Sequence, residues 1–544
     1  MPNCVTCLTY YSVMEAKHTY LSYEETGYYS KIVIDYLQQH PQLQPFYQDA
    51  PTREGLAEAM AERRKFAGHR DTLVAALHQQ YASLEVAPAL ANNINALLSN
   101  DTFTITTAHQ PNIFTGPLYF IYKILHTIKL AEFCTKEFPG ARFVPVYYMG
   151  SEDADLDELG SITLDGKKYN WQTKQTGAVG RMKVDKAFLA LVTEMEGQLG
   201  ILPHAAEIIG LFKQYYTAGT TIQQATLGLV NALFGTYGLV VLVPDEPALK
   251  AVFKPVIKRE LLEGFSHKEV AVTVAELEKN YKVQAAGREL NLFYLINDRR
   301  ERIERNGDHF EVVGLNLRFT AEEILAELDH HPGRFSPNVI LRGVFQETVL
   351  PGIAFIGGGG ELAYWLELKR VFAAAGVPYP VLVLRNSFLL VNGKWQEQLQ
   401  KLGITAAEAF QPEHELMNTI VQQHGTQKIG LNGELGKVKE LYRQISETAG
   451  AVDVSLQQHV AALQTRAVQK LEELEKKMLR AEKRKHSTTQ RQLSHLKAAL
   501  FPNDNLQERV ENMAGVYALY GQALLNMLLQ QSPALEQEFV ILFI

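Results

Sequence analysis

A short polar loop near residue 110 has the residue types for binding an anion or moving a proton. A Gly-Pro pair follows it at residue 116, and proline favours the first position of a helix. A helix N-terminus attracts carboxylate or phosphate, and a histidine beside it can stabilise phosphoryl charge or act as a base on an amine. A loop histidine can also be purely structural. We predict a catalytic role for His109 and substrate binding by Gln110, Asn112, Thr115 and Gly116.

A second set of candidate residues is acidic. Glu152, Asp153 and Asp155 lie close together, and two more acidic residues follow directly. Clustered carboxylates can hold an ammonium group, bind Mg²⁺ through oxygen or take a proton, although they can also form a solvated turn. We predict catalytic roles for these three carboxylates. The sequence has no HExxH motif and no cysteine cluster with zinc spacing, so we assign no metal ligands.

A glycine run at residues 357–360 is the third set. Leu362 stands where the last glycine of GxGxxG would be, and no GxxxxGK[ST] motif occurs, so neither phosphate-binding fingerprint is present. Glycine runs also serve tight turns. We predict that Gly358 and Gly359 of this run contact the substrate, together with Glu361 after it and Arg342 and Gln346 before it. We predict further substrate contacts by Tyr119 and Lys123, in the helix that follows the polar loop.

Strand and helix patterns around these sets predict a doubly wound parallel α/β core. Apolar, β-branched runs predict strands at residues 103–108, 143–149, 238–243, 353–356 and 381–384. Amphipathic segments predict helices from residue 118, at 248–262 and at 361–375. In such a fold ligands bind beyond the carboxyl ends of the strands, where all three candidate sets fall.

The remaining segments divide the chain further. We predict an N-terminal helical layer, three core parts separated by two connecting inserts, and a C-terminal helical coiled-coil region used for dimerisation. Their boundaries are 1–100 for the layer, 101–160, 237–262 and 339–390 for the core, 161–236 and 263–338 for the inserts, and 391–544 for the coiled coil.

The C-terminal region has a helical repeat of its own. Residues 452–500 contain neither proline nor glycine, and their apolar residues recur about every 3.67 positions, which predicts a long, nearly straight helix. A helix of this length needs a partner helix. We expect the partner to be the return helix at residues 506–529 or a second copy of the chain, and we predict a homodimer.

Composition narrows the class of protein. The chain has 544 residues and a net charge of −7, whereas residues 464–500 carry ten Lys/Arg against four Asp/Glu. An acidic body argues against general nucleic-acid binding, and no apolar run reaches membrane-spanning length. Three cysteines and no signal-peptide pattern favour the cytoplasm. Cys4 and Cys7 have metal-like spacing, but no second pair completes a four-ligand site.

Several long motifs resemble the bacillithiol biosynthesis cysteine-adding enzymes, in order over nearly the whole chain. They are HQPNIFTGPLY at 109–119, EDAD at 152–155, HPGRFSPNV at 331–339, LPGIAFIGGGGE at 350–361, ALFPN at 499–503 and LQER at 506–509. Two positions depart from the usual form: many members have Gly-Gln-Gln at residues 108–110 and a histidine at residue 154.

The resemblance implies a cysteine ligase with a Rossmann-type, nucleotidylyltransferase-like core. It would join the carboxyl group of L-cysteine to the glucosamine amine of glucosaminyl-malate, the last step of bacillithiol biosynthesis. Activation of the carboxylate implies ATP as co-substrate, with Mg²⁺. The alternatives are an adenylyltransferase acting on another small molecule and a non-catalytic coiled-coil scaffold for a ligase.

Overall fold

The computed structural model describes residues 17–284, 287–424, 431–485 and 487–544. The chain forms two compact units. The first comprises Met1–Leu389 and Leu506–Val540, and the second comprises Leu390–Asn505 and Ile541–Ile544. Cys4 and Cys7 lie outside the described residues, so the structure does not test their role.

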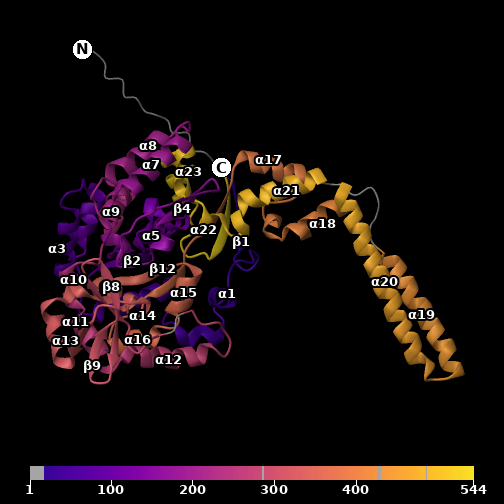
Figure 1. The fold of residues 1–544 in the computed structure, drawn as a ribbon, viewed down its shortest axis with the longest axis horizontal. Coiled ribbons are helices and arrows are strands. Elements are labelled where there is room, and N and C mark those ends of the chain that lie inside the picture. Colours follow the sequence, from indigo (N-terminus) through magenta and orange to yellow (C-terminus); the bar gives the residue numbers. More distant parts are fainter. Residues whose placement is uncertain (1–16, 285–286, 425–430, 486) are drawn as a thin grey trace, which may run out of the picture. The chain divides into compact units, whose positions relative to one another are not determined.

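A five-stranded parallel sheet forms the centre of the first unit (Figure 1). Its strand order is β13-β12-β2-β3-β6. The first strand in sequence, β2, is central; β3 and β6 are added on one side of it, and β12 and β13 on the other. The order reverses between β2 and β12, which is the switch point of a doubly wound fold. The strands are β2 (Thr102–His109), β3 (Arg142–Met149), β6 (Val240–Leu242), β12 (Gly352–Gly357) and β13 (Val381–Leu384).

The predicted doubly wound parallel core is confirmed. Every residue of β2 and β12 is buried, as expected for strands covered on both faces. One hydrophobic cluster joins the sheet to helices α2 (Arg53–Lys65) and α5 (Tyr119–Glu137), through side chains such as Met60, Leu130 and Ile353. This packing fixes α5, whose N-terminal end faces the site.

Two predicted crossover helices are each divided in two. The helix expected at 248–262 becomes α10 (Pro247–Val252) and α11 (Lys254–Glu263), because Pro255 has no N–H and starts a new helix. The helix expected at 361–375 becomes α15 (Gly359–Trp365) and α16 (Lys369–Ala375). Those two predictions of single helices were wrong.

The rest of the first unit covers this core. The N-terminal elements are β1 (Lys17–Ser22), α1 (Lys31–Leu37), α3 (Arg70–Tyr81) and α4 (Pro88–Ala96). Helix α6 (Leu156–Leu159) precedes the first insert, which contains β4 (Ser161–Leu164), β5 (Lys167–Asn170), α7 (Lys186–Leu199), α8 (Ala205–Tyr215) and α9 (Ile222–Phe234). The second insert contains α12 (Phe265–Leu277), β7 (Leu292–Ile296), β8 (Arg299–Asn306), β9 (His309–Val312), β10 (Leu317–Thr320), α13 (Ala321–His330) and β11 (Phe335–Pro337). Helix α14 (Val339–Val349) follows it at the start of the third core part.

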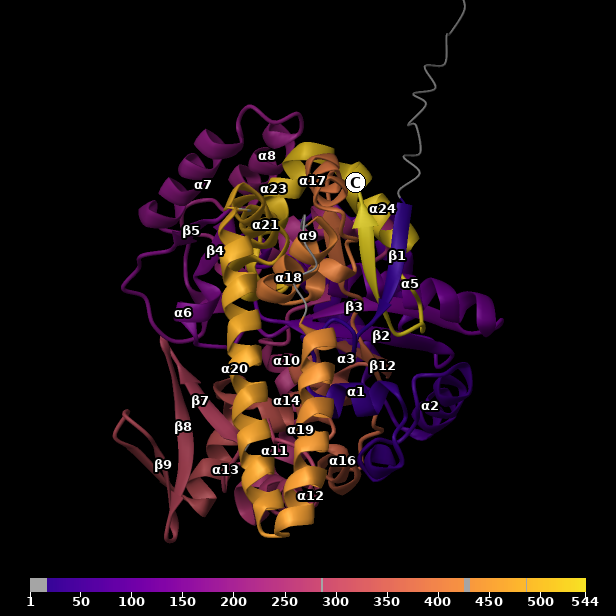
Figure 2. The same ribbon diagram turned by 90° about the vertical axis from the view of Figure 1, so that its right-hand side faces the viewer.

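The second unit is helical and contains an antiparallel hairpin of two long helices (Figure 2). The helices α19 (Asn432–Val452) and α20 (Leu456–Lys485) pack along each other. Helices α20 and α21 (Ser487–Leu500) occupy most of the span 452–500 predicted as one helix, and residue 486 between them lies outside the described residues. The predicted start was wrong, since Val452 belongs to α19 and α20 starts at Leu456. The other helices of this unit are α17 (Gly393–Leu402) and α18 (Glu413–His424).

The long helix also has a different partner from the one expected. Residues 506–540 belong to the first unit, so the expected return helix cannot form the coiled coil with α20, whose partner within the chain is α19. The return segment folds as α22 (Gln507–Val510), α23 (Met513–Tyr520) and α24 (Gln522–Gln531), divided at Gly521, which has a positive φ of 58°. Pairing with a second copy of the chain stays a prediction.

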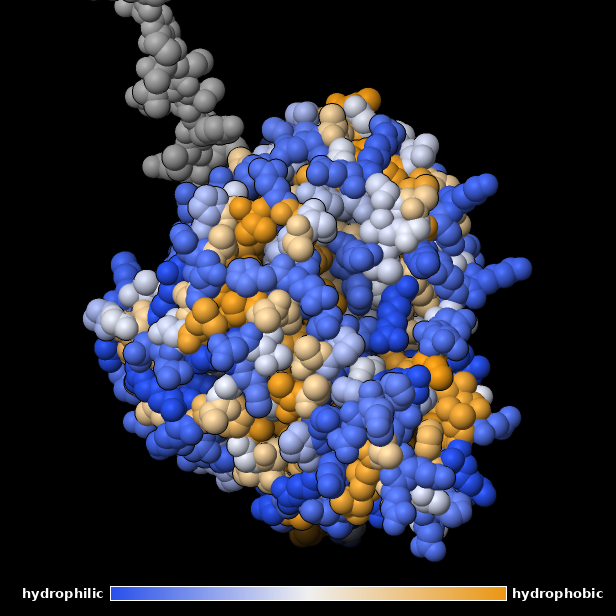
Figure 3. Space-filling model, turned by 90° about the vertical axis from the view of Figure 1, so that its left-hand side faces the viewer, coloured by the Kyte–Doolittle hydropathy of each residue, from blue (hydrophilic) through white to orange (hydrophobic). Residues whose placement is uncertain are grey.

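The C-terminal strand β15 (Glu538–Phe543) lies between β1 and β14 (Phe388–Val391) in a small three-stranded sheet. The face drawn in Figure 3 is mostly hydrophilic, with hydrophobic side chains in separate patches. Across the described part of the chain, no helix combines the length and the apolar character that crossing a bilayer requires.

Candidate functional site

The register of the parallel sheet brings the three candidate sets to one edge. His109 at the end of β2 pairs with Met149 at the end of β3, and Gly357 at the end of β12 pairs with Leu384 at the end of β13. The loops that follow these strands therefore start at the same level. This is the carboxyl edge of the sheet, and it includes the switch point between β2 and β12.

A cavity of about 650 Å³ opens at this edge, within the size range of small-molecule sites. Ten of the residues predicted as site residues line it: His109, Gln110, Tyr119, Lys123, Glu152, Asp153, Arg342, Gly358, Gly359 and Glu361. Five others are not among the described lining residues: Asn112, Thr115, Gly116, Asp155 and Gln346. Two thirds of the predicted site residues thus lie together around one cavity at this edge of the sheet.

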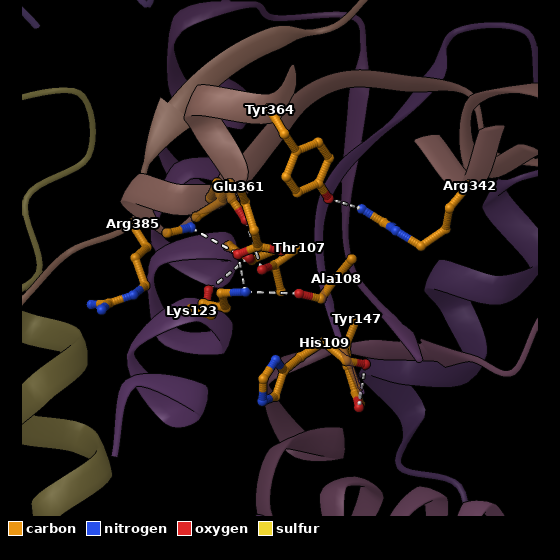
Figure 4. A network of polar contacts seen from close by, with 12 residues as sticks. Thr107, Ala108, His109, Lys123, Tyr147, Arg342, Glu361, Tyr364 and Arg385 are labelled. Atoms are coloured by element: carbon orange, nitrogen blue, oxygen red, sulfur yellow. Dashed lines mark hydrogen bonds and ion pairs between the residues drawn. The ribbon is translucent and has the colours of Figure 1, made fainter. Parts of the chain in front are cut away.

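Lys123 links the first helix to the glycine loop across the switch point (Figure 4). Its ammonium group donates to the carbonyl oxygen of Ala108 at 2.9 Å and pairs with the Glu361 carboxylate. Glu361 also accepts from the backbone N–H of Gly358 at 2.8 Å, which caps α15. Burial lowers the pKa of Lys123, and the Glu361 carboxylate opposes that shift. The pair therefore holds β2, α5 and the glycine loop together.

His109 is a neutral imidazole in the cavity wall. Its ring packs edge-on against Tyr119, with ring centres 5.3 Å apart. Burial, with the cations Lys123 and Arg385 nearby, holds the pKa of His109 well below its ordinary value. Its Nε2 has no hydrogen-bond partner among the described residues. A neutral imidazole with a free nitrogen can accept a proton from a ligand or donate a hydrogen bond to it.

Arg342 extends into the same space from α14. One nitrogen donates to the Tyr364 hydroxyl at 2.7 Å and another to Oε1 of Gln346 at 3.1 Å (Figure 4 shows the first). Gln346 thus acts through Arg342 rather than at the cavity surface. Two fixed hydrogen bonds orient the planar guanidinium, the side chain best suited to recognising carboxylate or phosphate.

The acidic loop contains one carboxylate that is already committed to a buried network. Glu152 pairs with the buried Lys250, which also contacts Asp245 at 3.0 Å. Arg181 makes two 2.6 Å contacts with the same aspartate. Although burial opposes ionisation, Lys250 and Arg181 hold the pKa of Asp245 at about 2. Glu152 is therefore tied through Lys250 to a buried network and reaches the cavity from it.

Asp153 and Asp155 have different surroundings. Asp153 lines the cavity and accepts from the Gln110 amide at 3.1 Å, so the polar loop and the acidic loop meet there. Asp155 caps α6 by accepting from the backbone N–H of Glu158 at 3.1 Å. Burial, reinforced by Asp155 and Asp153, raises the pKa of Glu158. Asp153 is thus the loop carboxylate placed to meet a ligand, and Asp155 shapes the loop.

The first loop, residues 113–116, is held from outside by Asn512. The Asn512 amide donates to the carbonyl oxygens of Phe114 and Gly116, at 2.8 and 2.5 Å. Phe114 and Thr115 adopt positive φ angles of 49° and 72°, which non-glycine residues rarely do. The described contacts of this turn are with the scaffold, and roles in substrate binding for Asn112, Thr115 and Gly116 stay predictions.

Five cationic lining residues were absent from the sequence prediction: Arg288, Arg300, Arg302, Arg385 and Arg509. The first three come from the insert around β7 and β8, whose length and folding no local motif reveals. Arg300 lies over the Phe293 ring at 3.8 Å, and burial lowers its pKa. Arg509 belongs to the LQER motif, which was a usable signal.

The lining is electropositive in an acidic chain. Its described residues include seven Arg or Lys side chains against four Asp or Glu, an excess of three positive charges. The whole chain has a net charge of −7. The described part of the chain contains no group of three or more His, Cys, Asp or Glu side chains placed to hold a metal ion. The excess of positive charge in the lining fits an anionic organic ligand.

Comparison with known proteins gives two family matches that together span the chain. Residues 14–386 match "Bacillithiol biosynthesis BshC, N-terminal Rossmann-like domain". Residues 388–544 match "Bacillithiol biosynthesis BshC, C-terminal coiled-coil domain". The boundary between the two matches falls next to the boundary between the two compact units at residue 389.

Similar proteins from several bacteria have the name "Putative cysteine ligase BshC". The one from Flavobacterium psychrophilum is 39% identical, covering 96% of this chain and 98% of the relative. The one from Christiangramia forsetii is 38% identical with the same coverage, and the one from Salinibacter ruber is 28% identical over 92% of this chain and 95% of the relative. A solved Campylobacter jejuni structure titled "putative arginyl t-RNA synthetase" aligns at 11% identity with a TM-score of only 0.20, covering 81% of this chain and 97% of that chain.

Proposed function

Because this chain belongs to the bacillithiol biosynthesis BshC family, we propose that it is a cysteine ligase acting at the cavity of its Rossmann-like unit. The reaction forms an amide bond between the carboxyl carbon of L-cysteine and the glucosamine nitrogen of glucosaminyl-malate. One carboxyl oxygen leaves on the phosphate of the activating nucleotide, and the ammonium nitrogen of the acceptor loses two protons. The product is the thiol bacillithiol. The relatives' name supports the cysteine and the ligase chemistry.

The observation that carries this proposal is the electropositive cavity at the carboxyl edge of the sheet. Glucosaminyl-malate has two malate carboxylates and one amine. Arginine forks such as Arg342 recognise carboxylates, and the carboxylate of Asp153 can hold the amine. The cavity thus offers complementary charge for both ends of this acceptor, at a position where ligands bind in this class of fold.

The proposed roles follow from the contacts of each residue. Asp153 binds the acceptor ammonium and takes its proton, because it lines the cavity and has a neutral amide, Gln110, as its described side-chain partner. Glu152 holds the loop through Lys250. His109, neutral and with a free Nε2 within the described structure, hydrogen-bonds the developing charge at the reacting carboxyl group.

Amide formation from a free carboxylate is uphill, so we propose ATP as the activating co-substrate. The seven cationic lining residues can bind phosphate oxygens as well as carboxylates. No group of three metal-binding side chains occurs among the described residues, so Mg²⁺ would enter with the nucleotide phosphates. We assign no catalytic step to a metal held by the protein.

A reconstitution assay tests the function. Purified full-length protein is incubated with glucosaminyl-malate and L-cysteine, with and without ATP, and the products are identified by mass spectrometry. The proposal expects bacillithiol together with AMP if cysteine is adenylated, or with ADP if an acyl phosphate forms. Transfer of AMP to another acid without bacillithiol would favour an adenylyltransferase. Absence of any product under all conditions would contradict a catalytic role.

A further inference from the structure

The segment that follows the helical second unit in sequence contains a buried acidic residue next to a residue that lines the cavity. The chain re-enters the first unit at Leu506, and α22 (Gln507–Val510) follows directly. Glu508 on this short helix has no exposed surface, whereas its neighbour Arg509 lines the cavity. A fully buried carboxylate needs partners that compensate its lost hydration.

Those partners all belong to the residues that follow β13. Arg385 donates to Oε1 of Glu508 at 2.7 Å, the Ser387 hydroxyl donates to the same oxygen at 3.1 Å, and the Phe388 backbone N–H donates to Oε2 at 3.2 Å. Both carboxylate oxygens are therefore used. The side chains of Arg385 and Glu508 are 3% and 0% exposed, so this is a fully buried ion pair.

Arg385 connects this pair to the cavity. It lines the cavity, and its guanidinium lies over the Tyr119 ring at 5.2 Å. It also donates to the carbonyl oxygen of Asn386 and to the Ser387 hydroxyl, at 3.1 and 2.9 Å. These bonds and the contact with Glu508 fix the plane of the guanidinium. Figure 4 shows Arg385 on the same side of the site as Lys123.

We propose that Glu508 is a positioning residue that holds Arg385 as a contact for an anionic group of the substrate. Glu508 itself is not among the described lining residues, so it acts through Arg385. The substrate group is a carboxylate, which rests on the proposed function. The inference assigns a role to the LQER segment, which lies more than 100 residues beyond β13 in sequence and yet completes the site.

The nearest polar groups do not replace Glu508. Tyr29 contacts the Ser387 hydroxyl at 2.7 Å, and the Tyr23 hydroxyl donates to the Arg385 carbonyl oxygen at 3.1 Å. Burial raises the pKa of both tyrosines, so both remain uncharged. Loss of the Glu508 charge would leave Arg385 with neutral hydrogen-bond partners and with the cation Lys123 nearby. A buried cation without its partner moves or draws in water.

The test compares Glu508→Gln, Glu508→Asp and wild-type full-length protein. Glu508→Gln keeps the shape but removes the charge. We expect it to raise the KM for glucosaminyl-malate at least tenfold, with kcat and the KM for L-cysteine within about threefold of wild type. Glu508→Asp restores the charge and recovers part of the lost affinity. A purely structural role predicts equal changes for both substrates.

A matched control is Asp35→Asn, which removes one negative charge from another carboxylate of the first unit that is largely buried. Asp35 pairs with Lys31 at 2.5 Å and accepts from the Tyr281 hydroxyl at 2.7 Å, and it is not among the described lining residues of the cavity. We expect this variant to lower thermal stability like Glu508→Gln, but to leave the KM for glucosaminyl-malate within twofold of wild type. If Glu508→Gln changes that KM no more than the control does, the inference is overturned.

Calorimetric binding of glucosaminyl-malate, with L-malate as the smaller probe, separates this inference from the proposed function. If the wild type binds the acceptor but forms no bacillithiol, the proposed function fails. A tenfold larger dissociation constant for Glu508→Gln would still support the role of Glu508. Equal dissociation constants, or no binding of either probe by wild type, would overturn it.

Discussion

At the scale of single residues, burial explains which of the predicted groups can do chemistry. Glu152 and Asp153 are adjacent and of the same type, yet one is tied to Lys250 and the other faces the cavity beside Gln110. Sequence can identify the acidic cluster but not this difference, because Lys250 lies almost one hundred residues away. The fold therefore decides that Asp153, with no cation among its described hydrogen-bond partners, is the carboxylate placed to meet a ligand.

His126 gives the stability of the protein a pH dependence that can be measured. Its ring is fully buried, its Nδ1 accepts from the Asn386 N–H at 3.1 Å, and its Nε2 contacts the Ala534 carbonyl oxygen at 2.9 Å. Burial lowers the pKa of His126 to about 4. Below pH 6.5 the His126 ring is protonated in the unfolded chain but not in the native state. The free energy of unfolding therefore decreases as pH falls from 6.5 towards 4.

The expected size is about 2 kcal/mol between pH 7 and pH 5, from 1.36 kcal/mol per pKa unit. Urea unfolding of wild type and of His126→Gln at both pH values measures it. The variant is less stable at pH 7, because it lacks the two ring contacts, but it should lose about 2 kcal/mol less on acidification. Parallel pH dependences would show that His126 is not protonated on unfolding in this range.

At the scale of elements, the regular strands could be predicted and the breaks between helices mostly could not. β13 was predicted at the observed residues, 381–384, because buried parallel strands are continuous apolar runs. The divisions at Pro255 and at Gly521 follow local backbone chemistry and had a signal in the sequence. The choice of α19 as the partner of α20 had none, since several amphipathic helices could compete.

Gly116 illustrates an element that depends on one residue. It has φ 65° and ψ −151°, a region reserved for glycine, and a Cβ there would lie 2.8 Å from Cβ of Asn112. We expect Gly116→Ala to lower the free energy of unfolding by roughly 1–3 kcal/mol. Gly210→Ala, inside α8 with open space around it, should instead raise it by about 0.5–1 kcal/mol. Urea denaturation checks both signs, and equal effects would contradict the strained turn.

At the scale of the whole molecule, the site is assembled from segments spread over about 400 residues. The cavity takes residues from the ends of four core strands, from the hairpin of the second insert and from the segment after the helical unit. The core edge could be predicted from strand order alone. The arginines of the hairpin could not, because their approach depends on tertiary packing, whereas Arg509 had a signal in the LQER motif.

The account therefore depends on the cavity being the place of reaction, and its acidic loop offers a matched pair of substitutions. Asp153 lines the cavity, whereas Asp157 lies four residues later, is exposed and is not among the described lining residues. Asn replaces Asp in either case with loss of one negative charge and almost no change in size. Long-range electrostatic effects of the two substitutions are thus similar.

The decisive measurement is the initial rate of bacillithiol formation by Asp153→Asn and by Asp157→Asn at saturating substrate concentrations. Circular dichroism first checks that both variants have the secondary structure of the wild type. The account predicts a loss of about 100-fold or more for Asp153→Asn, the usual size for a missing general base, and a rate within about twofold of wild type for Asp157→Asn. Wild-type turnover by Asp153→Asn would contradict it.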